Sequence, residues 1–131
     1  MLQPWAMDRL GHMNDEGLGG PPNPRKAADW FRESADDAYA PAMVSLAGLY
    51  ERGRGVAKDL DEAHQLYKKA VGRYERAAER GDATSMLALG KLYEEGRAVP
   101  RDLTEAQDWY RQAAEAGNVE ASERIRLSAI R

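Results

Sequence analysis

The chain has 131 residues, of which 43% are hydrophobic and 31% charged; its formal net charge is −3 and it contains no cysteine. This length and composition fit one soluble domain with a buried core. Disulfides and thiolate metal sites are excluded, and the slightly acidic balance argues against a nucleic-acid binder, which usually carries a basic face.

The N-terminal segment has no cationic stretch followed by an apolar run, so we expect no secretory signal. No window approaches the roughly 18 consecutive apolar residues that a membrane-spanning helix requires. The cytoplasm is therefore the expected compartment, and we expect no membrane insertion. The periplasm remains the alternative if the chain is a mature fragment.

One pattern recurs along the chain and predicts helix pairs at about residues 5–38, 41–81 and 84–117, followed by a closing helix at about 119–130. The first and second copies are offset by 36 residues, and the second and third by 43. The matched positions include Leu10, Leu46 and Leu89; Gly17, Gly53 and Gly96; Ala27, Ala63 and Ala106; Phe31, Tyr67 and Tyr110. We therefore expect an all-α repeat protein with one domain over residues 1–131.

Each copy predicts two helices with distinct signals. In the second copy, Leu46 belongs to an apolar face with helical spacing, and the small residue that follows it lets a partner helix approach closely. The first helix ends in a glycine loop at residues 53–55. Asp59 and Asp102 then take the N-cap position of the second helices, as Asn23 does in the first copy. The aromatic residues at the repeat period are expected in the core.

The segment LGKLYEEGRAVPRDLTEAQDWYRQAAEAGN, Leu89 to Asn118, closely resembles a Sel1-like repeat, a relative of the tetratricopeptide repeat. The resemblance covers about residues 5 to 127. It implies a right-handed α/α superhelix, or solenoid, of about three repeats plus the closing helix. In this family the first helix of each pair lines a concave face, and most members act as scaffolds or adaptors for protein partners.

The second copy carries seven extra residues in YKKAVGRYERAAERG, which correspond to about two helical turns, or roughly 10 Å. Because a seven-residue step nearly preserves the helix face, Tyr74 is expected to point in the same direction as Tyr67. We expect a longer second helix that projects as a ridge. The ridge is either a partner contact around Tyr74 or an extension without function, and Gly72 is its weakest point.

The side of each first helix opposite the buried stripe supplies candidate partner-binding residues. An apolar line along the groove would suit a protein or peptide, whereas scattered surface aliphatic residues are the alternative. Leu127 has the further alternative of packing within the last helix. Trp5 is expected to close the open end of the core, or else to lie at a partner surface. The candidates on the concave face are Asp8, His12, Val44, Glu51, Leu87, Lys91, Glu94, Glu123 and Leu127.

No metal-binding, nucleophile or phosphate-binding motif is present, and the two histidines, His12 and His64, show no catalytic spacing. We therefore expect no enzyme, no cofactor and no metal. The leading hypothesis is a protein–protein interaction module, either a scaffold or adaptor or an inhibitor or immunity-type protein. A structural protein that forms homo-oligomers through its end repeats is the alternative, and a hydrolase-type enzyme is a weaker one.

Overall fold

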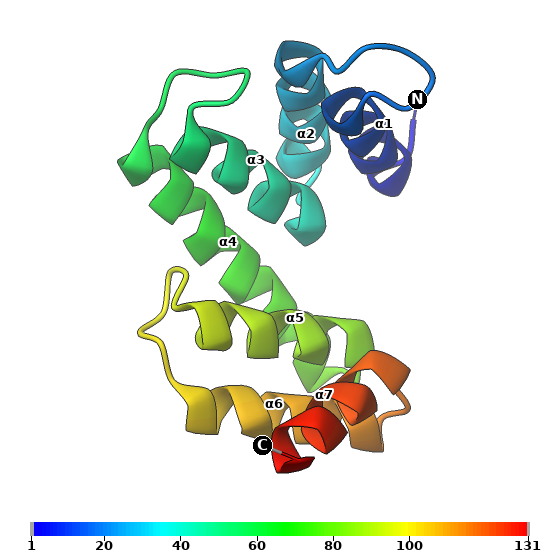
Figure 1. Cartoon of the computed structure of the whole chain (residues 1–131), viewed down its shortest axis with the longest axis vertical. Coiled ribbons are helices and arrows are strands. Elements are labelled where there is room, and N and C mark those ends of the chain that lie inside the picture. The colour runs from blue at the N-terminus through cyan, green and yellow to red at the C-terminus, as the bar shows by residue number, and fades with distance from the viewer. Residues whose placement is uncertain (1, 131) are drawn as a thin grey trace. The chain divides into compact units, whose positions relative to one another are not determined.

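The computed structural model describes the backbone of residues 2–130 and the side chains of residues 2–128. Within this part of the chain the fold has seven α-helices and no strand (Figure 1). In chain order they are α1 (Pro4–Glu16), α2 (Pro24–Asp36), α3 (Ala40–Arg52), α4 (Leu60–Glu79), α5 (Ala83–Glu95), α6 (Leu103–Glu115) and α7 (Val119–Ile130). The predicted all-α fold of three helix pairs and a closing helix is confirmed.

The helices fall into two compact units that divide within α4. The first unit holds α1, α2, α3 and α4 up to Ala70, and the second holds α4 from Val71 with α5, α6 and α7. In the first unit α1 packs along α2, and α2 packs against α3. In the second unit α5 packs along α6, and α6 packs against α7 (Figure 1). Each unit therefore contains a helix pair followed by the first helix of the next copy, and the single domain stays a prediction.

Matching positions of the repeat form the core of each unit. Leu46 and Leu89 are buried, as the sequence predicts. The aromatic residues that recur on the second helices, Phe31, Tyr67 and Tyr110, are buried as well. The neighbouring tryptophans, Trp30 and Trp109, are only half-buried, although they recur at the same period.

Small residues on the first helices allow the aromatic rings to lie against helix backbone. A Cβ atom added to Gly11 would overlap the ring of Phe31, and one added to Gly90 would overlap the ring of Tyr110. Ala47, at the same position of the second copy, is fully buried. The predicted close approach of the paired helices thus has a direct cause in the glycine and alanine positions.

The predicted caps fix where the helices begin and end. The side chains of Asn23, Asp59 and Asp102 each accept a hydrogen bond from the backbone N–H three residues on, at 3.0–3.1 Å. At the C-terminal end of α3, Gly53 takes a left-handed backbone conformation with φ of 63°. Gly55 follows with φ of 75°, at a point where a Cβ atom would collide with the backbone at the start of α2.

The insertion lengthens α4 to 20 residues, compared with 13 each in α2 and α6. Residues 68–75 are helical throughout, so the expected longer helix is confirmed. Gly72 lies within it, and an added Cβ atom there would meet nothing within 4 Å.

Candidate protein-binding surfaces

In the first unit, α1 places two of the predicted residues one turn apart. His12 Nε2 lies 3.5 Å from Asp8 Oδ2 and 3.3 Å from the hydroxyl of Ser45 on α3. The ring of His12 meets Phe31 edge-on, with 4.9 Å between the ring centroids. The hydrogen bond with Asp8 raises the pKa of His12 above its ordinary value of 6.5, and partial burial opposes that rise. The structure thus joins Asp8 and His12 into one polar pair.

A hollow of about 410 Å³ opens beside this pair, lined mainly by α1. The indole of Trp5, at its edge, is 59% exposed, and Met13 and Leu18 on the same hollow are exposed as well. The expectation that Trp5 closes the core is therefore wrong. The ring of Phe31, rather than the indole, packs in the interior of this helix pair, against Gly11.

The two other candidates of the first unit, Val44 and Glu51, are both half-buried. The hydroxyl of Tyr67 donates a hydrogen bond of 2.7 Å to Glu51 Oε1. Glu51 therefore accepts the hydrogen bond of a buried tyrosine hydroxyl in its own helix pair. This structural role differs from the predicted role on a binding face.

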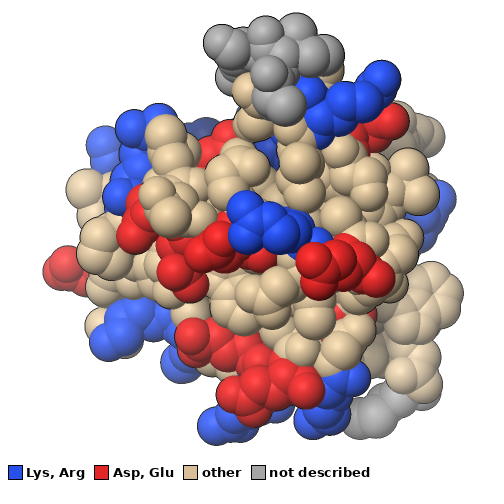
Figure 2. Space-filling model, turned by 90° about the horizontal axis from the view of Figure 1, so that it is seen from below, with Lys and Arg blue, Asp and Glu red and all other residues tan. Residues whose placement is uncertain are grey.

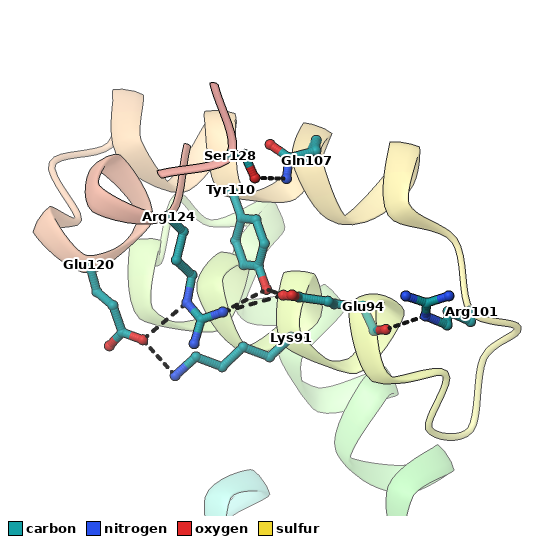
Figure 3. Close-up of polar contacts among 8 residues, drawn as sticks. All are labelled: Lys91, Glu94, Arg101, Gln107, Tyr110, Glu120, Arg124 and Ser128. Carbon is teal, nitrogen blue, oxygen red and sulfur yellow. Dashed lines mark hydrogen bonds and ion pairs between the residues drawn. The ribbon is translucent and has the colours of Figure 1, made fainter. Parts of the chain in front are cut away.

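In the second unit, α5 and α6 repeat this contact. The hydroxyl of Tyr110 donates a hydrogen bond to Glu94, and Arg124 Nη1 lies 3.3 Å from Glu94 Oε1 (Figure 3). Burial raises the pKa of Tyr110 well above its ordinary value, and the hydrogen bond to Glu94 adds to that rise. Arg124 comes from α7, so the closing helix joins the same network.

A second polar contact connects the first helix of the third copy with the closing helix. Lys91 Nζ on α5 lies 2.9 Å from Glu120 Oε2 on α7, and Arg124 Nε approaches the same oxygen to 3.3 Å (Figure 3). The hydrogen bond from Lys91 lowers the pKa of Glu120. Lys91 thus joins α5 to the N-terminal part of α7, whereas the Arg124–Glu120 contact lies within α7.

The closing helix borders a hollow of about 390 Å³ whose other walls are α5 and α6. Three of the predicted residues line it: Glu94, Glu123 and Leu127. Leu127 is 51% exposed, and Glu123 is exposed and paired with Arg126 one turn further on. With Lys91 beside Glu120, the structure brings four predicted residues to one surface.

Two predicted residues are not available to a partner. Leu87 is only 7% exposed, so its expected place on an open apolar line is wrong, and Tyr74 is only 8% exposed, so its side chain offers little surface for the partner contact that was one of the two alternatives. A first helix here buries side chains on more than one side, and its apolar arc is wider than a single stripe. Tyr74 keeps the face of Tyr67 across the seven-residue step, and that face is the buried one.

The hydrogen-bonded tyrosine–carboxylate pairs are the feature of these candidate residues that the sequence interpretation missed. Glu51 and Tyr67 recur as Glu94 and Tyr110 at the same offset of 43 residues. The first copy loses both members together, because Asp15 and Phe31 stand there. That joint change was a signal for contact between the two positions.

Comparison with known proteins agrees with this geometry. The sequence model of the Sel1 repeat matches residues 6–39, 40–71, 74–82 and 83–118. The chain belongs to the Sel1 repeat family. The match is interrupted at residues 72 and 73, within the part of α4 that carries the insertion.

Several relatives share parts of this Sel1 repeat chain. A sel1-like repeat-containing protein of Acanthamoeba polyphaga mimivirus is 36% identical over 66 residues, which are 50% of this chain and 12% of the viral protein. A Sel1 repeat protein of Oxalobacter formigenes, known from its crystal structure, is 34% identical with a TM-score of 0.58, over 95% of this chain and 48% of that one. The chain therefore spans less than half the length of these two relatives.

Helicobacter pylori cysteine rich protein B shows the same fold at 21% identity, with a TM-score of 0.51 and 91% of each chain covered. In the described part of this Sel1 repeat chain, no helix is both long and apolar enough to cross a bilayer. The described side chains also form no group of three or more histidines and carboxylates placed to hold a metal ion.

Proposed function

We propose that this Sel1 repeat chain is a non-catalytic adaptor that holds one protein partner on the surface formed by α5, α6 and α7. Sel1 repeats commonly mediate protein–protein interaction, and membership of the family supports the general role. The observation that carries the proposal is the hollow of about 390 Å³ beside α7, where half-exposed Leu127 lies among charged side chains. An apolar side chain in a concave, polar-rimmed site is typical of a peptide-binding surface.

The charges around the hollow define the chemistry of the partner. Its lining contains three carboxylates and one guanidinium, supplied by Glu94, Glu120, Glu123 and Arg124. On the face drawn in Figure 2, acidic side chains cross the middle with basic ones between and around them, and no broad basic patch is visible. This balance suits a segment that carries an apolar side chain next to a lysine or arginine.

The apolar contact can be tested with a matched pair of substitutions. Leu127 and Leu103 are 51% and 50% exposed, so replacing either with glutamate should leave folding intact. Only Leu127 lines the hollow. Proteins captured by both the wild-type chain and Leu103→Glu should be lost with Leu127→Glu. With a purified partner, the dissociation constant of the Leu127→Glu complex should be about tenfold or more above that of the wild-type complex. Circular dichroism checks that all three proteins keep the same helicity.

Leu87→Glu is not a suitable test, because burial of Leu87 would confuse loss of binding with loss of structure. The proposal fails if Leu127→Glu captures the same proteins with the same affinity as the wild-type chain. It also fails if no protein is captured by the wild-type chain in preference to a chain unfolded beforehand.

A further inference from the structure

Exposed apolar side chains gather on α1 and on the two short segments that flank it. Half of the large apolar side chains that are exposed lie in the first 18 residues: Leu2, Trp5, Met13 and Leu18. Three of them, Trp5, Met13 and Leu18, line the hollow of about 410 Å³ on the first unit. A surface of this kind is typical of an interface.

The other copies show that this position of the repeat is normally covered. Met13 corresponds to Leu49 in the second copy and to Leu92 in the third, and both leucines are buried. Ala6 and Leu10, which are partly exposed on α1, likewise correspond to buried Ala42 and Leu46 on α3. α1 therefore has the face of an internal repeat helix without the cover that such a helix receives.

Two oppositely charged side chains on this face are not engaged in an ion pair within the described chain. Arg9 and Glu16 both line the hollow and are exposed, and neither makes a hydrogen bond or an ion pair with a described residue. They lie seven residues apart, about 10 Å along the axis, and on nearly the same side of the helix. Opposite charges placed in this way are self-complementary.

We propose that α1 forms the interface of a homodimer, in which α1 of one copy packs antiparallel against α1 of a second copy. A two-fold axis beside His12 and Met13 would place Arg9 of each copy next to Glu16 of the other, so that symmetry creates two equal ion pairs. The same axis would bring Trp5 of one copy to the loop after α1 of the other, where Leu18 is exposed. The interface then has an apolar contact at each end and an ion pair on each side of its centre.

This inference does not rest on the proposed function, because the partner surface on α7 belongs to the other unit. A single helix face is smaller than a standard protein interface, so the dimer should be weak and should form at high concentration. It should also weaken with added salt, which screens exposed ion pairs.

Charge reversal tests the register of the two helices. Sedimentation velocity of the full chain over a range of concentrations should show a monomer–dimer equilibrium for the wild-type protein. Arg9→Glu places two glutamates together on each side of the centre of the interface and should raise the dissociation constant about tenfold or more. Adding Glu16→Arg to the same chain should restore the dimer, and an equimolar mixture of the two single variants should form a heterodimer.

Lys69→Glu reverses an exposed cation on α4 and serves as the control for net charge; it should dimerise as the wild-type chain does. Circular dichroism verifies the fold of every variant. A wild-type chain that stays monomeric at the highest soluble concentration overturns the proposal. So does a dimer that Arg9→Glu leaves unchanged, or one that the double variant does not restore.

Discussion

The first and third helix pairs solve the same packing problem with different chemistry. In both, a glycine of the first helix admits an aromatic ring of the second, Gly11 for Phe31 and Gly90 for Tyr110. The third pair adds a hydroxyl, and Glu94 accepts its hydrogen bond. The first pair has no hydroxyl, and the shorter acid at the matching position, Asp15, instead receives a hydrogen bond of 2.7 Å from Arg54 Nε.

This difference shows that the ring and the carboxylate change together. A buried hydroxyl without an acceptor is destabilising. A carboxylate that loses the tyrosine hydroxyl as its donor is satisfied by a cation instead. Arg54 of the next loop provides that cation in the first pair, whereas Arg124 of α7 reinforces Glu94 in the third. The packing of ring on glycine is constant, and the polar contacts around it vary.

The glycine contact should have the largest effect on stability. Gly90→Ala introduces a Cβ atom that overlaps the ring of Tyr110, which is itself fixed in the core. We expect the free energy of unfolding to fall by about 2 kcal/mol. Gly72→Ala is the control, because a Cβ atom there meets nothing within 4 Å and should raise stability by about 0.5–1 kcal/mol. Urea unfolding followed by circular dichroism measures both changes.

Equal changes in the two variants would show that the ring does not need the glycine. The double variant Gly90→Ala, Tyr110→Leu sharpens this test, because the smaller side chain leaves space for the methyl group. The double variant should lose less free energy of unfolding than the sum of the losses in the two single variants, as expected for residues in direct contact.

The polar difference between the pairs can be transferred from the third to the first. Phe31→Tyr should lower the free energy of unfolding by about 1–1.5 kcal/mol, since the carboxylate at the matching position, Asp15, is shorter than Glu94 and already accepts from Arg54. Asp15→Glu in the same chain supplies the acceptor found in the other pairs and should recover about 1 kcal/mol. The coupling energy from a double-mutant cycle in urea measures this recovery.

Tyr110→Phe is the mirror experiment and should cost a similar amount, because Glu94 then keeps only Arg124. If Asp15→Glu changes the free energy of unfolding equally with phenylalanine or tyrosine at position 31, the carboxylate and the ring are independent. That result would contradict the inference that the two positions change together.

Most of the repeat frame follows from sequence, and the reason is visible in particular residues. Leu46 and Leu89 recur at a fixed offset, and the caps at Asp59 and Asp102 give local signals, so helix pairs and core are predictable. Exposure was harder to predict. Burial of Leu87 depends on the side from which a neighbouring helix arrives, and one helical wheel does not contain that information.

The candidate surface was predictable in part for the same reason. Lys91, Glu94, Glu123 and Leu127 do meet at one surface, because they share a side of successive first helices. The contribution of α6 to that hollow, through Tyr110, depends on tertiary packing. Whether Val44 joins a common apolar line stays a prediction.

A smaller effect is expected at the turn between α2 and α3. Ala38 has a left-handed φ of 65°, whereas the matching residue after α4 is Gly81, with φ of 90°. Because a Cβ atom disfavours this conformation, Ala38→Gly should raise the free energy of unfolding by about 0.5–1 kcal/mol. Gly81→Ala should lower it by a similar amount. Thermal unfolding of both variants checks the opposite signs, and a loss of stability in Ala38→Gly would contradict the argument.

The smallest effect concerns the pH dependence of stability in the first pair, where His12 packs against the ring of Phe31. Asp8, Asp15 and Glu16 on α1 all raise the pKa of His12, and its neighbours from α2 and α3, Phe31 and Ser45, carry no charge. A pKa raised on folding means that the folded state holds its proton more tightly. The stabilisation is therefore complete below about pH 6.5 and is lost as the pH rises through the folded pKa.

Because His12 is about half exposed, the change is screened by solvent and should be smaller than any of the changes above. The urea midpoint of the wild-type chain should fall between about pH 6 and pH 8, and His12→Gln should remove part of that fall, whereas exposed His64→Gln should not. Measuring all variants at one low protein concentration keeps the chain monomeric, so that the fall reports the Asp8–His12 pair within one copy. If His12→Gln and His64→Gln flatten the profile equally, the pair adds nothing specific to the stability of the first unit.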